Sequence, residues 1–349
     1  MKSLTYRAFF LFLVSLEVIF VVSDALASPE FLELCASASP AEVAEAIVGG
    51  VDVNEPDENG LTPLMLVVSL NRPEIVDVLV QLSVDVNAQD ADGWTALMWA
   101  TIRSNVTVVE KLIAASADLD IQSSRYMTAL LSSVLENRTE VSRLLIGAGA
   151  YVDARNEEGV TSLMLAVSKG NLETIDALLR AGASVNAEDG GGWTALLWST
   201  ISGDVRVAKT LIAASADVRV PDREGITPVM SAAYRGYANL LSLLIQAGGD
   251  VDAATVDEVT ALSLACESEN EEIVNILIAA GAECQVRDRD GLTPLMAAAR
   301  KGNVRILSLL IKAGATLNAE DNDGWTALRY ATEFQNEEAA ELLARSGAK

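Results

Sequence analysis

Few side chains in this sequence could perform catalysis. The chain has no histidine, which is the residue most often used for general acid–base chemistry near neutral pH. It contains no paired cysteines, no phosphate-binding loop of the form G-x-x-x-x-G-K-[ST] and no G-x-G-x-x-G fingerprint. We therefore expect no catalytic residue, no cofactor and no enzymatic activity.

Acidic loops are the nearest approach to a metal site. Residues 90–93, 288–291 and 321–324 each read Asp-x-Asp-Gly, which is faintly similar to the start of a calcium-binding loop. The bidentate glutamate that completes such a loop is missing downstream, and the absence of histidine excludes a Cys/His zinc site. We therefore expect solvated turns and no metal site.

A fixed period organises the chain into repeating elements. A threonine recurs every 33 residues without any insertion, a regularity that marks stacked supersecondary units. Its positions are Thr62, Thr95, Thr128, Thr161, Thr194, Thr227, Thr260, Thr293 and Thr326.

The unit that begins near Thr293 shows which elements the period contains. Thr293 can cap a helix through its hydroxyl group, and Pro294 then occupies the first helical position. Gly302 ends this short helix, an apolar second helix covers residues 304–311, and Gly314 suits a left-handed helix end. The extended stretch 317–324 leads to the next threonine. Each unit is therefore predicted to be helix, turn, helix and a hairpin-like loop.

This pattern resembles the ankyrin repeat, whose units run roughly D-x-x-G-x-T-P-L-H-x-A-A, then a glycine, an apolar helix and G-A-D-x-N-A. The resemblance covers residues 29–349 and predicts an all-α solenoid of about ten stacked units. The family's usual histidine is replaced throughout, so its threonine–histidine hydrogen bonds are absent and packing has to substitute. The replacements are Met65, Met98, Leu131, Met164, Leu197, Met230, Ser263, Met296 and Arg329.

The period also fixes the predicted boundaries within a single elongated domain, residues 28–349. A degenerate first unit covers residues 29–59, where Ser39 and Glu42 form a capping box. The further units are residues 60–92, 93–125, 126–158, 159–191, 192–224, 225–257, 258–290, 291–323 and 324–349. In the unit 258–290, Glu258 and Glu269 stand where other units have glycine. We expect this to be the least stable internal unit.

The three cysteines have places in the same register. Their odd number and irregular spacing do not fit a disulfide framework. Cys35 and Cys266 share the register of Ala299, and Cys284 shares that of Val185 and Leu317. All three therefore replace small or apolar core residues.

The first 27 residues lie outside the repeats and are predicted to be a signal peptide. Lys2 and Arg7 precede the apolar stretches 8–16 and 18–22, and residues 25–27 form an A-x-A cleavage site. Glu17 interrupts the apolar stretch, which leaves it short of a membrane span; an uncleaved anchor is the alternative. We expect export, with the periplasm favoured over the extracellular space, and no membrane span in the mature chain.

The resemblance places the partner-binding surface on the concave side, which the hairpin tips and the ends of the first helices form. The nine residues that directly precede the threonines are all apolar and include three tryptophans, the residue type that dominates binding hot spots. Of the eighteen positions seven and eight residues after the threonines, five are basic and three are acidic, so their charges sum to +2 and the surface is expected to be apolar and mildly basic. The candidate partner-binding residues are Trp94, Trp193, Trp325, Met127, Ile102, Arg103, Leu135, Lys169, Ile201, Tyr234, Arg235, Arg300 and Lys301.

Charge is segregated around this surface. The chain has a net charge of −24, and acidic residues are concentrated at the hairpin tips. This arrangement favours solubility or the steering of a basic or mixed-charge protein, and it disfavours nucleic acid, which needs clustered lysine and arginine. We expect a monomeric, non-catalytic scaffold that binds a protein partner. Two alternatives are a periplasmic helper of an exported enzyme and a secreted effector acting on host proteins.

Overall fold

The computed structural model describes residues 29–349, and all the regular secondary structure in that range is helical. The chain divides into two compact units, one ending at Ser184 and the other beginning at Val185. Isolated antiparallel bridges occur in four hairpins, at Gln89–Thr95, Arg155–Thr161, Glu188–Thr194 and Ala254–Thr260. The predicted signal peptide lies outside the described residues.

The first unit contains five helix pairs. Their bounds are α2 Pro29–Ser37, α3 Pro40–Val48, α4 Pro63–Ser69, α5 Pro73–Gln81, α6 Ala96–Arg103, α7 Val106–Ala114, α8 Ala129–Leu135, α9 Thr139–Gly147, α10 Ser162–Ser168 and α11 Leu172–Arg180.

The second unit also contains five pairs. Their bounds are α12 Ala195–Ser202, α13 Val205–Ala213, α14 Pro228–Arg235, α15 Ala238–Gln246, α16 Ala261–Glu267, α17 Glu271–Ala279, α18 Pro294–Lys301, α19 Val304–Lys312, α20 Ala327–Glu333 and α21 Glu337–Arg345.

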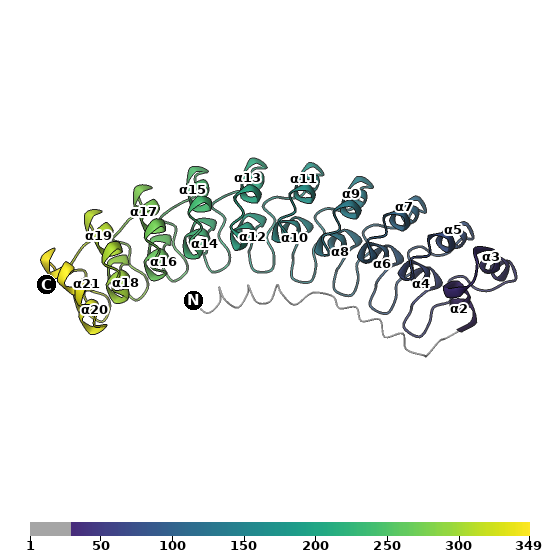
Figure 1. Cartoon of the computed structure of the whole chain (residues 1–349), viewed down its shortest axis with the longest axis horizontal. Helices are drawn as coiled ribbons and strands as arrows, with labels where there is room; N and C mark the ends of the chain where they lie inside the picture. The colour runs from purple at the N-terminus through teal and green to yellow at the C-terminus, as the bar shows by residue number, and fades with distance from the viewer. Residues whose placement is uncertain (1–28) are drawn as a thin grey trace. The chain divides into compact units, whose positions relative to one another are not determined.

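Within each unit the helices form two parallel rows (Figure 1). The even-numbered, first helices of the pairs contact one another in sequence, as α4 contacts α6 and α14 contacts α16. The odd-numbered, second helices form the other row, in which α5 contacts α7 and α17 contacts α19. The hairpin loops extend beyond the first-helix row, on the side away from the second helices (Figure 1). In each of the two units, we call the surface formed by its first helices and hairpin tips the first-helix face.

The predicted threonine caps are confirmed in all nine repeats. Each threonine adopts an extended conformation, and its hydroxyl oxygen accepts the N–H of the third helical residue. Pro294 occupies the first turn of α18, and Gly302 ends that helix with a φ of 78°. The capping box of Ser39 and Glu42 is also present. These caps satisfy backbone groups that a short helix would otherwise leave unpaired.

Residues that stand in place of histidine do more than the packing expected from the sequence. Met164 and Met296 are each only 1% exposed, so they fill the core as predicted. In addition, the Met164 sulfur accepts the Thr161 N–H at 3.5 Å, and the Met296 sulfur accepts the Thr293 N–H at 3.4 Å. Two repeats therefore retain a weak reciprocal cap through sulfur.

Neighbouring repeats are joined by a recurring hydrogen bond at the base of the hairpins. Asn54 accepts the backbone N–H of Asp85, and Asn87 accepts that of Asp118, both across 31 residues. In the second unit Asp252 accepts the N–H of Glu283 in the same way. This bond is one means by which repeats that are too small to fold alone stabilise one another.

The positions that lack the expected glycine adopt left-handed backbone conformations. Tyr126 has a φ of 58°, Glu258 of 63° and Glu269 of 58°. Because a side chain disfavours this region, the repeat 258–290 contains two locally strained residues. Its predicted low stability stays a prediction.

Candidate partner-binding surface

The hairpin turn fixes the residue that precedes each threonine. In the hairpin that precedes Thr95, Asp90 Oδ1 accepts the backbone N–H groups of Asp92 at 3.0 Å and Trp94 at 2.8 Å. The backbone N–H of Asp90 donates to the carbonyl of Trp94 at 2.9 Å, and Gly93 supplies a φ of 78°. Trp94 is therefore the last residue of a closed turn and directly precedes Thr95, the N-cap of the next helix.

An aromatic donor completes this turn in three repeats. The Trp99 indole N–H donates to Asp90 Oδ2 at 3.1 Å. Trp198 donates to Asp189 at 3.1 Å, and the Tyr330 hydroxyl donates to Asp321 at 2.6 Å. We call this contact the aspartate–aromatic clasp.

The clasp was not found by sequence reasoning, although the sequence contains its signal. The same three repeats carry a tryptophan directly before the threonine, at positions 94, 193 and 325. They also carry an aromatic hydrogen-bond donor four residues after the threonine. Burial raises the pKa of Asp90, even though hydrogen bonds from Trp94, Trp99 and Asp92 lower it. Burial would also raise the pKa of Asp321, but hydrogen bonds from Tyr330, Trp325 and Asp323 hold it below its usual value.

The predicted tryptophans differ in what they offer to a partner. Trp94 is half-buried, with its ring centroid 5.7 Å from that of Trp99. Trp325 is half-buried beside Tyr330 at 5.1 Å. Trp193 is only 8% exposed and Met127 only 9%. Trp193 and Met127 therefore offer little area, whereas Trp94 and Trp325 remain accessible in part.

The ends of the first helices carry the other predicted residues. Arg103, Lys169 and Lys301 are exposed. The remaining members are half-buried, and all stand at or next to the last turn of a first helix: Ile102, Leu135, Ile201, Tyr234, Arg235 and Arg300. Each unit therefore carries both apolar and basic side chains at the ends of its first helices.

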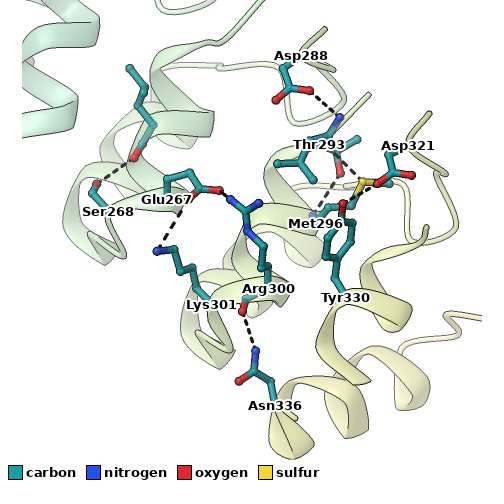
Figure 2. A network of polar contacts seen from close by, with 12 residues as sticks. Glu267, Ser268, Asp288, Thr293, Met296, Arg300, Lys301, Asp321, Tyr330 and Asn336 are labelled. Atoms are coloured by element: carbon teal, nitrogen blue, oxygen red, sulfur yellow. Dashed lines mark hydrogen bonds and ion pairs between the residues drawn. The ribbon is translucent and has the colours of Figure 1, made fainter. Parts of the chain in front are cut away.

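Part of the basic charge is already neutralised within the second unit. Glu267 forms ion pairs with Arg300 and, at 3.9 Å, with Lys301 of the following repeat (Figure 2). Asn336 donates to the carbonyl oxygens of Ala299 and Arg300, both at 2.9 Å, and so joins the next repeat to the end of α18. Glu267, Arg300 and Lys301 thus form one charged cluster, whereas the sequence analysis treated them as separate residues.

Acidic residues at the tips serve two purposes. Asp90, Asp222 and Asp288 use one carboxylate oxygen to close their own turns. Other acids point into solvent, as the exposed positions of Asp92 and Glu158 indicate. Other exposed tip acids include Glu58, Glu157, Glu188, Glu224, Asp257, Glu258, Asp290, Glu320 and Asp323.

Exposed apolar side chains add residues that the sequence did not single out for binding. Leu70 is 47% exposed and Phe334 is 52% exposed, and both stand eight residues after a repeat threonine. Tyr126 and Val256 are exposed at hairpin tips. All four lie on elements of the first-helix face.

The three cysteines of residues 29–349 are poorly placed for thiolate chemistry. Cys35, Cys266 and Cys284 are unpaired and buried, as predicted from their register. Burial raises the pKa of the Cys35 thiol to about 11 and also raises the pKa values of Cys266 and Cys284, so all three favour the unreactive thiol form. Within the described range there is no group of three or more residues suited to hold a metal ion.

None of the helices α2–α21 combines the length and apolar character required to cross a membrane.

Comparisons with known proteins agree with this architecture. The family model described as ankyrin repeats (3 copies) matches residues 32–123, 102–189, 130–222, 196–288 and 262–349. Among solved structures, the ankyrin repeat domain of Bcl-3, described as a unique member of the IkappaB protein family, is similar with a TM-score of 0.58 and 27% identity. The match covers 63% of this chain and 99% of the Bcl-3 chain. No curated protein matches. Because the family model covers most of the sequence, the chain belongs to the ankyrin-repeat family.

Proposed function

We propose that this protein binds a protein partner through its first-helix face, outside the cytoplasm, and catalyses no reaction. The observation that carries the proposal is the collection of accessible apolar side chains on that face. Leu70, Tyr126, Val256 and Phe334 are among the few exposed large hydrophobic residues of the described range. Exposed apolar groups with a polar rim are typical of protein interaction sites.

Charge supports a division of roles on this face. Ile102 and Leu135 provide apolar area at the ends of their helices, and Lys169 provides an exposed cation beside it. Exposed acids such as Glu157 and Glu158 form the tips. Apolar contacts would supply most of the affinity, and the charges would select the partner and speed its approach.

Export is supported by the sequence of the first 27 residues. Lys2 and Arg7, the following apolar stretch and the A-x-A site at residues 25–27 fit a signal peptide. We propose cleavage after Ala27 and release into the periplasm. The intact mass of the protein recovered from the cell envelope tests this step, since cleavage at another place or no cleavage gives a different mass.

Affinity capture from an envelope extract with the mature chain tests the binding function. A captured protein would be purified and its affinity measured for Ile102→Ala and Lys169→Glu. Lys209→Ala, at an exposed position on the second helix α13, is the matched control. We expect the first two changes to weaken binding and the control to leave it unchanged. Equal affinity for all variants, or a stronger effect of the control, would contradict the assignment of the face.

A further inference from the structure

We propose that the part of the first-helix face around α20 is a docking site for a cationic side chain, an arginine or lysine presented by a protein segment. The inference rests on the proposed function, since it names the partner chemistry that one part of the same face would take. Three aromatic rings, one internal cation and the surrounding carboxylates carry it.

The rings of Trp325, Tyr330 and Phe334 form a continuous aromatic series. The ring centroids of Trp325 and Tyr330 are 5.1 Å apart, and those of Tyr330 and Phe334 are 6.3 Å apart. Phe334 is 52% exposed, and the other two are half-buried. The series therefore presents accessible aromatic surface, which attracts cations.

Hydrogen bonds hold this aromatic series in place. Asp321 accepts the Tyr330 hydroxyl at 2.6 Å through one oxygen and the Trp325 backbone N–H at 2.8 Å through the other. Figure 2 shows the contact between Asp321 and Tyr330. Because the Tyr330 ring and the backbone of Trp325 are already held, less side-chain entropy would be lost when a ligand binds.

The guanidinium group of Arg329 already lies over one of the rings, that of Trp325. The guanidinium carbon of Arg329 lies 4.4 Å from the centroid of the Trp325 ring. Arg329 is exposed, and its guanidinium is in no ion pair among residues 29–349. The Trp325 ring is therefore suited to a guanidinium group, and Arg329 is an internal competitor for it.

The surrounding charge favours a cation from outside over an anion. The carboxylate of Asp321 contacts Tyr330, and Asp323 and Glu333 are exposed on either side of the series in sequence. Burial, Asp321 and Asp323 raise the pKa of Tyr330 to about 12, and the charge of Arg300 opposes them only in part. Arg300 and Lys301 also lie nearby, but both pair with Glu267 (Figure 2).

Fluorescence anisotropy with labelled peptides tests the inference. The probes are a peptide of alternating arginine and glycine and its glutamate counterpart, each titrated with the mature chain. Trp325→Leu and Phe334→Leu keep the sites apolar, and leucine occurs at both registers in other repeats, as Leu292 and Leu70. We expect the two changes together to weaken binding of the arginine peptide about tenfold. Unchanged binding would mean that only diffuse acidity attracts the peptide.

The change Arg329→Met tests whether the site prefers a cationic or an anionic ligand. Methionine occupies this register in five other repeats, so the fold should tolerate it. We expect about fivefold tighter binding of the arginine peptide, because the internal competitor is removed. Arg345→Met, which removes the same charge from α21, should have a much smaller effect. Weaker binding of the arginine peptide to Arg329→Met, or preferential binding of the glutamate peptide, would overturn the inference.

The proposed function is tested independently of the site at α20. A captured partner that is lost with Ile102→Ala but kept with the Trp325 and Phe334 variants would preserve protein binding and refute the site at α20. Thermal unfolding of every variant, followed by circular dichroism, verifies that the helices remain folded.

Discussion

At the scale of single residues, Ser162 stands out because its hydroxyl group is buried and forms no hydrogen bond within the described residues. Alanine occupies the same register in five other repeats. We predict that Ser162→Ala stabilises the first unit by about 1 kcal/mol, since an unpaired buried hydroxyl is unfavourable. Urea unfolding measures the change.

Ser133 provides the matched control for this prediction. It is equally buried, but its hydroxyl donates to the Leu130 carbonyl at 2.8 Å and lies 2.9 Å from the Ser142 hydroxyl. Ser133→Ala should therefore destabilise the unit, in contrast to Ser162→Ala. Destabilisation by both changes would show that a hidden partner, such as a water molecule, satisfies Ser162.

The aspartate–aromatic clasp gives a second prediction for individual side chains. In Asp90→Asn, the amide nitrogen would face the Trp99 indole N–H, so two donors would meet where the carboxylate now accepts at 3.1 Å. We predict a loss of about 1–3 kcal/mol in the free energy of unfolding. Adding Trp99→Phe should recover part of this loss, because the second donor is gone.

One hairpin of the chain already combines an asparagine in the turn with a residue that has no side-chain donor. Asn156 closes its turn by accepting the backbone N–H groups of Glu158 and Val160. The residue nine positions later is Leu165, which has no side-chain donor. A double-mutant cycle at positions 90 and 99 measures the coupling, and additive effects of the two changes would contradict the clasp.

At the scale of one repeat, the turn between α16 and α17 is strained. Glu269 has a φ of 58°, whereas glycine stands at this register in four other repeats, for example Gly302 with a φ of 78°. We predict that Glu269→Gly stabilises the repeat 258–290 by about 0.5–1 kcal/mol, because glycine tolerates the left-handed region. Hydrogen exchange followed by mass spectrometry should show slower exchange in α16 and α17.

Two further variants check the cause of that effect. Glu269→Ala retains a Cβ atom and therefore the strain, so it should give little or no gain. Gly203→Ala should destabilise its repeat, since the added Cβ would lie 2.9 Å from ring atoms of Tyr237 at a φ of 70°. A gain from alanine at position 269 equal to that from glycine would assign the effect to the glutamate charge.

The helices were predictable because their signals are local. A threonine cap, a proline in the first turn and a glycine at the helix end lie within a few residues of one another, as in α18. The candidate surface depends on contacts between positions that are distant in sequence. Glu267 and Arg300 are 33 residues apart, and Trp193 is buried by its surroundings although Trp94 in the same register is not. The repeat pattern predicts which positions face outward, but the neighbouring side chains determine how far each is exposed.

At the scale of the whole molecule, net charge governs how a partner approaches. The chain carries −24, and much of that charge stands on exposed hairpin tips such as Glu157, Glu158 and Asp92. Clustered charge of one sign accelerates the encounter with a partner of opposite charge, and dissolved salt screens it.

We therefore predict that the association rate constant of a basic partner falls about tenfold between low and high ionic strength, while the dissociation rate changes little. The double change Glu157→Gln and Glu158→Gln should lower the association rate at low salt and leave the helices intact, because both side chains are exposed. Surface plasmon resonance over a series of salt concentrations measures both rates. An association rate independent of salt would exclude steering by the tips and leave solubility as the role of their charge.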